Sequence, residues 1–162
     1  MRYILRQKIF SLSDKFYIKD ERDNPKYYVE GKIFSLGDKL KLFDLEGTEL
    51  IYIEQKLLRL LPEYNIYKYG KLLARVKKEL TLFRPKFNIE SDYGNFTIEG
   101  DFFGHDFSIL KNGKPVAFVS KKWLSLSDTY YVDIVADEDH PFILSLAIVL
   151  DQVLHDDENN NR

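Results

Sequence analysis

The sequence contains no cysteine. This absence excludes disulfide bonds, thiolate nucleophiles, and zinc or iron–sulfur sites built on cysteine. It is compatible with a reducing compartment. The three histidines, His105, His140 and His155, show none of the spacings of common metal-binding motifs such as HExxH. We therefore predict that the protein uses neither a metal nor another cofactor.

The chain also lacks the long apolar runs of targeting and membrane-spanning segments. Residues 1–8, MRYILRQK, contain no apolar core of the length that a signal peptide needs. Arg2 stands where N-myristoylation would require glycine. The most apolar stretch, residues 142–150, is too short to span a bilayer. We predict a cytoplasmic protein that is at most peripheral at a membrane.

Charge is distributed unevenly along the chain. The whole sequence has 24 bases and 26 acids, which gives a formal net charge of −2. Residues 137–158 contain seven of the acids and neither lysine nor arginine. Subtracting those seven leaves 19 acids against 24 bases, a net charge of about +5 for the remainder. The sequence therefore describes a basic body with an acidic C-terminal segment.

Hydrophobic and polar residues alternate through most of the chain. Such alternation, bounded by turn residues, is typical of β-strands. The strongest turn signal is Asn112-Gly113, because this pair tolerates the positive φ angles of a tight hairpin. We predict twelve strands, over Tyr3–Ile9, Lys15–Asp20, Lys26–Phe34, Lys39–Asp44, Thr48–Leu57, Glu63–Tyr69, Leu72–Leu80, Lys86–Ser91, Asn95–Phe102, Asp106–Lys111, Lys114–Trp123 and Thr129–Ala136.

A short segment between strands recurs along the sequence. Lys8–Lys15, KIFSLSDK, returns almost unchanged as Lys32–Lys39, KIFSLGDK. Successive copies are roughly 20 to 25 residues apart, the length of two strands and two turns, so we interpret them as a hairpin repeat. The alternative is that the later copies reflect only the usual composition of strands and turns. Looser copies follow at Lys56–Glu63, Glu79–Lys86, Asp101–Asp106 and Lys121–Asp128.

The last apolar segment explains how so many strands could form one domain. Residues 142–150 contain a single polar residue, Ser145, and a helix that is apolar on all sides must be buried. Twelve antiparallel strands leave two exposed edges unless they close, and a barrel of that size needs its interior filled. We therefore predict a mainly β fold, a closed antiparallel barrel of about 12 strands around a buried hydrophobic C-terminal α-helix at about 141–154. Residues 1–155 would form this single domain, and residues 156–162 a disordered tail.

Both this layout and several segments of the sequence resemble the LURP-one-related branch of the tubby-like superfamily. The resemblance covers almost the whole chain and is carried by Lys8–Lys15, Lys32–Lys39, Gly100–Phe107, Lys121–Trp123, Tyr130–Ile134 and the helix at 141–154. It implies a twelve-stranded barrel threaded by a helix, and it supplies no reaction. Tubby domains bind phosphoinositides through basic residues, but no motif here allows those residues to be transferred individually. The distantly similar phospholipid scramblases carry lipid-anchor cysteines, which this chain lacks.

The most basic stretch of the chain is residues 68–86. Alternation predicts that Ala74 and Val76 face the interior while Arg75 and Lys77 face outward, so that the charges share the outer surface. Such a surface could hold a phosphorylated headgroup or an anionic membrane. The candidate ligand-binding residues are Lys68, Lys71, Arg75, Lys77, Lys78, Arg84 and Lys86.

Two alternatives apply to this basic stretch. The simpler one is an ordinary solvated face of the barrel. The other is stacking on single-stranded nucleic acid, since Tyr67, Tyr69 and Phe83 interleave with the bases. In a chain with this many aromatic residues the second argument is weak, and we do not expect a nucleic-acid partner.

Two small groups of residues raise catalysis as an alternative. His105-Asp106 could orient an imidazole for base chemistry, and Glu99 and Asp101 share one strand face as a carboxylate pair. A histidine in a turn and surface carboxylates two residues apart are the simpler interpretations. We therefore predict no catalytic residues and no enzyme.

The sequence thus favours a non-catalytic, monomeric interaction module for anionic lipid or phosphate headgroups. One alternative is a small-molecule carrier or an enzyme with a site at a barrel mouth, near His105 and the Glu99/Asp101 pair. Another is an adaptor that contacts a protein partner through its acidic tail.

Overall fold

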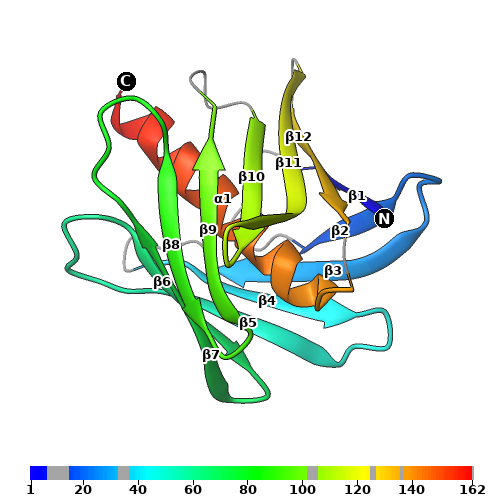
Figure 1. The fold of residues 1–162 in the computed structure, drawn as a ribbon. Coiled ribbons are helices and arrows are strands. Elements are labelled where there is room, and N and C mark those ends of the chain that lie inside the picture. Colours follow the sequence, from blue (N-terminus) through cyan, green and yellow to red (C-terminus); the bar gives the residue numbers. More distant parts are fainter. Residues whose placement is uncertain (7–14, 33–36, 102–105, 125–126, 136, 162) are drawn as a thin grey trace.

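The protein is a closed barrel of twelve antiparallel strands, as the sequence predicts. The computed structural model describes residues 1–6, 15–32, 37–101, 106–124, 127–135 and 137–161. The strands follow one another around the barrel in chain order, so every neighbour in the sequence is also a neighbour in the sheet (Figure 1). They are β1 (Arg2–Arg6), β2 (Lys15–Asp20), β3 (Pro25–Lys32), β4 (Lys39–Asp44), β5 (Glu49–Gln55), β6 (Glu63–Lys68), β7 (Lys71–Lys78), β8 (Lys86–Ser91), β9 (Gly94–Gly100), β10 (Asp106–Lys111), β11 (Lys114–Leu124) and β12 (Ser127–Ile134).

The barrel closes between its first and last strands. Arg2 of β1 lies opposite Asp133 of β12, and the register continues to Arg6 opposite Thr129. The Arg2 guanidinium donates to the Asp133 carboxylate at 2.8 Å across this seam. Closure pairs each of the twelve described strands on both sides, which removes the open edges on which sheets aggregate.

Alternation along each strand divides the side chains between core and solvent. Ile51 and Ile53 of β5 are buried, as are Val76 of β7 and Ile98 of β9. The predicted tight turn is confirmed, because Asn112 and Gly113 both adopt positive φ angles, 48° and 82°. The recurring segments at Lys8–Lys15 and Lys32–Lys39 lie partly outside the described residues, as do two later copies.

The helix α1 (His140–Asn160) runs through the barrel (Figure 1). Its apolar residues from Phe142 to Leu150 are buried, so the helix supplies the inner half of the core that the strands surround. Ser145 is also buried, and its hydroxyl donates to the Phe142 carbonyl at 2.6 Å. A polar side chain is tolerated inside the barrel because this local bond satisfies it.

The helix extends further than predicted. We expected it to end near residue 154 and residues 156–162 to be disordered, but α1 continues to Asn160 and includes most of that segment. The prediction was wrong because it judged the tail by its polarity alone. Lys78 of β7 donates to Asp157 at 2.6 Å, which gives the polar last turns of the helix a partner on the barrel wall.

The up-and-down order places alternate connections at opposite ends of the barrel. One end receives the start of α1 and the turns β6–β7, β8–β9 and β10–β11, and we call it the Asp139 end. The other receives the finish of α1 and the connections β5–β6 and β7–β8, and we call it the Asp157 end.

Candidate functional site

Strand β7 carries the centre of the predicted basic surface. Ala74 and Val76 are buried, and Arg75 and Lys77 are exposed on the outside of the barrel, as alternation predicts. The pattern arises because successive side chains of a strand point to opposite faces. The orientation predicted from the sequence is therefore confirmed for this strand.

The seven predicted bases nevertheless do not form one compact site. Lys68 and Lys71 flank the β6–β7 turn at the Asp139 end, whereas Lys78 finishes β7 at the Asp157 end. Lys78 follows Lys71 by seven positions of extended chain, a span of roughly 23 Å. The bases thus form a stripe along the barrel rather than a pocket around one ligand.

Lys68 is engaged in holding the helix. Its ammonium group contacts the carboxylate of Asp139 and donates to the Tyr93 hydroxyl at 3.0 Å. The hydrogen bond with Asp139 and then that with Tyr93 raise the pKa of Lys68. This lysine therefore belongs to a structural network rather than to a free cationic surface.

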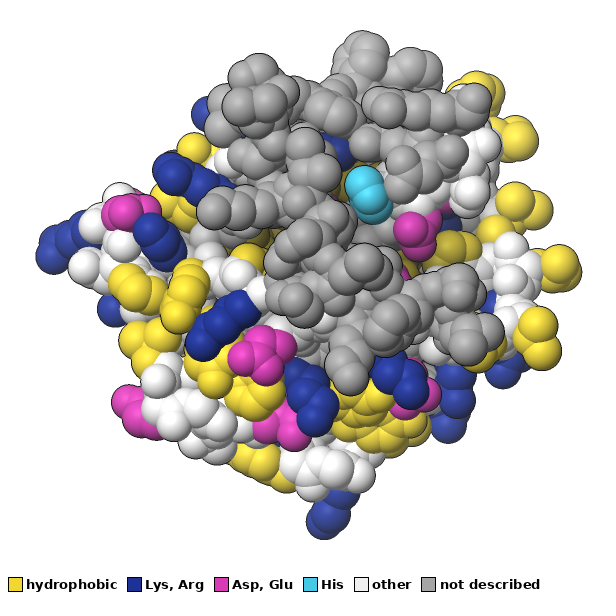
Figure 2. All heavy atoms as spheres, turned by 180° about the vertical axis from the view of Figure 1, so that it is seen from behind, with side chains coloured by type: hydrophobic (Ala, Val, Ile, Leu, Met, Phe, Trp, Pro, Cys, Tyr) yellow, Lys and Arg dark blue, Asp and Glu magenta, His cyan; other side chains and the backbone are white. Residues whose placement is uncertain are grey.

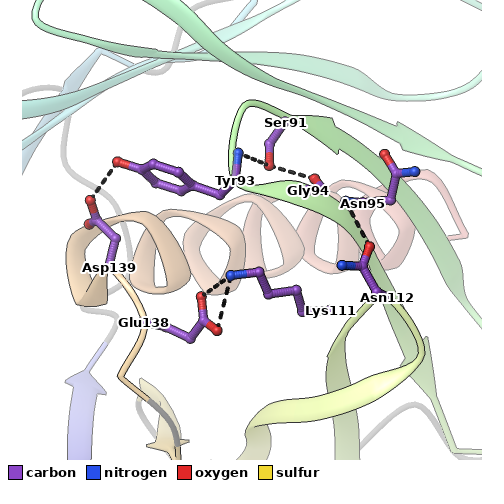
Figure 3. Close-up of polar contacts among 8 residues, drawn as sticks. All are labelled: Ser91, Tyr93, Gly94, Asn95, Lys111, Asn112, Glu138 and Asp139. Atoms are coloured by element: carbon purple, nitrogen blue, oxygen red, sulfur yellow. Dashed lines mark hydrogen bonds and ion pairs between the residues drawn. The ribbon is translucent and has the colours of Figure 1, made fainter.

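Asp139 is the centre of that network, and Figure 3 shows its bond with Tyr93. It is the N-cap of α1, and its carboxylate accepts the Phe142 amide at 3.0 Å and the Tyr93 hydroxyl at 2.9 Å. Burial alone would raise the pKa of Asp139, but the bonds from Lys68, Phe142 and Tyr93 together hold it below its usual value. An acid at this position also suits the positive end of the helix dipole.

A second ion pair reinforces the same end of the barrel. Lys111 of β10 donates to Glu138 at 3.1 Å, just before the helix cap (Figure 3). Because Glu138 and Asp139 each pair with a lysine on a strand of the barrel, two ion pairs hold the segment that enters α1. The acidic segment noted in the sequence thus serves in part to anchor the helix.

The bases at the opposite end are partly neutralised as well. Lys78 contacts Asp157, and Lys86 lies 3.8 Å from Glu79 and 4.0 Å from Glu99. Counting charges within residues 68–86 reveals Glu79 but misses acids that neighbouring elements bring close.

What remains is a smaller set of available cations. None of these forms an ion pair with a residue that the structure describes, and all are exposed. Three of them lie on β7, namely Lys71, Arg75 and Lys77. The fourth, Arg84, lies in the connection after that strand. Lys56, at the end of β5, has the same character and was not among the predicted residues. These cations lie along β7 and in the connections β5–β6 and β7–β8.

Two connections at the Asp157 end expose large apolar side chains that sequence reasoning missed. We call residues 56–62 and 79–85 the leucine loops. The predicted strands Thr48–Leu57 and Leu72–Leu80 ran two residues too far, because β5 ends at Gln55 and β7 at Lys78. The available signal was the run Leu57-Leu58-Arg59-Leu60-Leu61, which breaks strict alternation.

The exposure of these loops is visible in the space-filling view. Figure 2 shows the molecule from behind, so the two loops at the left of Figure 1 lie at its right edge. Hydrophobic side chains project from that edge. Leu58 and Leu60 are fully exposed, and Leu80 and Leu82 expose 87% and 90% of their surface. The leucine loops therefore present apolar groups beside the available cations.

The structure offers little support for the alternative of a carrier or enzyme site at a barrel mouth. Glu99 faces outward and lies near Lys86, and Asp101 follows β9, whereas His105 lies outside the described residues. Within the described ranges no group of three or more His, Asp or Glu side chains could hold a metal ion. A hollow of about 410 Å³ lies elsewhere, on the outer face of β5 and β6, where Tyr52 and Tyr67 line it. The interior that a carrier would need is occupied by α1.

One buried acid stands apart from these surfaces. Asp38, which precedes β4, is 5% exposed, and burial and then the charge of Asp156 raise its pKa to about 6. Tyr64 of β6 is buried nearby, and its pKa is raised by burial and by Asp38 and Asp156. The polar part of α1 thus meets acidic groups of the wall inside the Asp157 end.

Among the residues described, no helix is long and apolar enough to cross a membrane.

Comparison with known proteins gives a consistent picture. The sequence model of a family described as LURP-one-related matches residues 1–151. A protein of Bacillus subtilis (strain 168) named "Uncharacterized protein YxjI" is 41% identical over 157 residues, which cover 97% of this chain and 96% of that one. An X-ray structure of a protein from Arabidopsis thaliana superposes with a TM-score of 0.65 at 19% identity, and the match covers 94% of this chain and 91% of the other. The last likeness shows the fold alone.

Proposed function

The chain belongs to the LURP-one-related family, and from that premise we propose that it is a non-catalytic module that binds anionic, phosphate-bearing membrane surfaces. One observation carries the proposal. Exposed bases without an ion pair among the described residues run along β7 and into the next connection, on one side of the barrel. Each base held near an anionic membrane contributes on the order of 1 kcal/mol, so several together give useful affinity.

The geometry favours an extended surface over a small soluble ligand. The cations are spaced along a strand, so a single phosphate group would contact one or two of them. A membrane presents many headgroups and can meet all the cations that face it. The same phosphate chemistry occurs in soluble inositol phosphates, and the two sources are separable by experiment.

The test is co-sedimentation of the purified protein with vesicles. We expect binding to vesicles of phosphatidylserine mixed with phosphatidylcholine, no binding to phosphatidylcholine alone, and weaker binding at physiological than at low salt. Soluble inositol hexakisphosphate should compete only weakly if the membrane is the partner. Strong competition would instead indicate a soluble phosphate ligand.

Charge reversal identifies the surface responsible. Arg75→Glu with Lys77→Glu should abolish binding, because the change removes two bases and adds two acids on the outer face. The matched control is Lys114→Glu with Lys122→Glu, two exposed bases on β11, which should bind nearly as the wild type does. Unchanged binding of the Arg75/Lys77 variant would refute the proposal.

A further inference from the structure

We propose that the leucine loops insert into the interfacial region of an anionic bilayer, so that the protein docks end-on through the Asp157 end of the barrel. This inference rests on the proposed function and specifies which surface meets the membrane and how deeply. It is carried by six apolar side chains in two neighbouring connections: Leu57, Leu58, Leu60, Leu80, Leu82 and Phe83.

The exposure of these side chains is not required by the fold. The strands that flank the loops bury their inward residues, and Leu58 and Leu60 add nothing to that core because they are fully exposed. Connections at the opposite end are short turns with pairs such as Glu46-Gly47 and Asn112-Gly113, and single apolar side chains there, Leu45 and Tyr69, are also exposed. Contiguous exposed apolar groups on a soluble protein mark a surface that meets a partner or a membrane.

The two loops form one surface. Each is closed at its base by backbone bonds, from the Lys56 amide to the Glu63 carbonyl at 2.8 Å and from the Glu79 amide to the Lys86 carbonyl at 2.8 Å. A further bond links the first loop to the strand end from which the second loop begins, because the Lys78 amide donates to the Pro62 carbonyl at 3.0 Å. The leucines are therefore presented together on a fixed base.

The loops are also tied to the next hairpin. The Gly100 amide of β9 donates to the Pro85 carbonyl at 2.9 Å. An added Cβ at Gly100 would lie 3.2 Å from Pro85, so the strand and the second loop pack closely at this point. Anchoring on both sides fixes the base of that loop, from which Leu80 and Leu82 extend into solvent.

The charge around the loops matches an anionic bilayer. Lys56, Lys77 and Arg84 form no ion pair with any described residue, whereas Glu63, Asp157 and Glu79 each lie within 4 Å of a base. Glu63 pairs with Arg59 at 3.4 Å, and Glu79 lies 3.8 Å from Lys86. Apolar groups flanked by cations are also the arrangement of interfacial amphipathic helices, whose apolar face is buried about 5–10 Å into the boundary between headgroups and acyl chains.

A bilayer fits this surface better than a second copy of the chain. Two copies meeting through these loops would bring the same cations against each other, which opposes association. A bilayer instead offers negative headgroups to the cations and hydrocarbon to the leucines. Self-association and capture of a protein partner are therefore outcomes that the test must separate.

The first measurement uses the absence of cysteine from the chain. A single cysteine at Leu60→Cys, labelled with an environment-sensitive fluorophore, should show a blue shift and higher intensity on phosphatidylserine-containing vesicles. The control label at Leu45→Cys, at the Asp139 end, should report no change. If the wild type sediments with vesicles but the label at residue 60 does not respond, end-on insertion is refuted while the proposed function stands.

Two double variants test the apolar contribution. Leu58→Ser with Leu60→Ser should weaken vesicle binding about tenfold or more, because each leucine contributes through burial of its side chain. Leu45→Ser with Val135→Ser, which removes exposed apolar groups elsewhere, should bind as the wild type does. Since all four residues are exposed, equal circular dichroism and melting curves should verify the fold.

Charge reversal at the two ends of β7 tests the orientation. Lys77→Glu with Arg84→Glu should abolish binding, whereas Lys71→Glu at the Asp139 end should change it less than about twofold. Equal loss in both would mean that the barrel lies on its side, which refutes the inference but not the proposed function. No binding of the wild type to any vesicle refutes both. A wild-type dimer that the Leu58/Leu60 variant converts to monomer would assign the leucine loops to self-association.

Discussion

Lys78 of β7 donates to Asp157 of α1 at 2.6 Å, although 79 residues separate them in the sequence. The contact joins the last turns of the central helix to the barrel wall at the base of the leucine loops. It also neutralises a lysine that would otherwise add to the cationic surface there. One ion pair thus connects the fold to the surface that we propose as functional.

Replacing Asp157 by Asn should strengthen vesicle binding. The change frees Lys78, and one additional base near an anionic membrane contributes on the order of 1 kcal/mol, or about fivefold in affinity at low salt. Stability should change by less than about 1 kcal/mol, because the pair is partly exposed. Vesicle titration and denaturant unfolding measure the two effects separately. Weaker vesicle binding by this variant would show that Lys78 does not face the membrane.

Replacing Asp139 by Ala should destabilise the protein by about 2–3 kcal/mol. The change removes the N-cap of α1 and leaves Lys68 and Tyr93 without their shared acceptor. Asp139→Asn keeps a capping oxygen and should lose about half as much. Unfolding in guanidinium chloride at pH 7 gives both values, and an unchanged midpoint for the alanine variant would contradict this role.

The same carboxylate should make stability depend on acidity. Because the pKa of Asp139 is lower in the folded protein than in the unfolded chain, its stabilisation is present above about pH 4. It is lost as the pH falls through the folded value. The stability difference between the wild type and Asp139→Asn should therefore shrink on acidification below about pH 4, as unfolding curves at several pH values would show.

Asp38 should have the opposite effect. Its pKa is raised to about 6 in the folded protein, so between about pH 4 and 6 the unfolded chain is ionised while the folded protein remains protonated. Folding stability thus falls over that interval and stays low above it. Asp38→Asn should be more stable than the wild type by about 2–3 kcal/mol at pH 7.5 and equal to it at pH 3.5. A constant difference across this range would contradict the buried, protonated acid.

Gly100→Ala should destabilise the protein by about 1–3 kcal/mol through overpacking. An added Cβ would lie 2.7 Å from Cε1 of Phe107 and 3.2 Å from Cδ of Pro85. The aromatic ring must move, and with it the packing of β9 against β10. Thermal unfolding measures the loss, and the control Gly70→Asn, at a turn with open space, should change stability much less.

Local pattern was enough to predict the elements of this fold. All twelve strands were anticipated because a strand with one buried face alternates, as Ile51 and Ile53 illustrate. The helix was anticipated because residues 142–150 leave no face for water. Closure of the barrel was then inferred because the helix fills the interior of a barrel and the barrel covers the apolar surface of the helix. The outward direction of Arg75 and Lys77 came from the same alternation.

Local pattern failed where strands give way to connections. Leu57 and Leu80 were placed in strands because they are hydrophobic, although β5 and β7 end two residues earlier. The helix was ended too early for the complementary reason, since Asp156 and Asp157 are polar. In each case a side chain was assigned by its own hydropathy, whereas its position depends on what the barrel brings beside it.

The sequence by itself therefore determined the number and kind of elements. A strand that is buried on one face alternates between hydrophobic and polar residues, and a helix that is buried on all sides is uniformly apolar. Only the tertiary structure decided which charges are available. Lys68 lies 71 residues from Asp139 in the chain, and Lys78 lies 79 residues from Asp157, yet each pair meets where α1 enters or leaves the barrel. An ion pair requires its two charged groups to come into contact, so its partners are set by closure of the barrel around the helix and not by neighbourhood in the sequence.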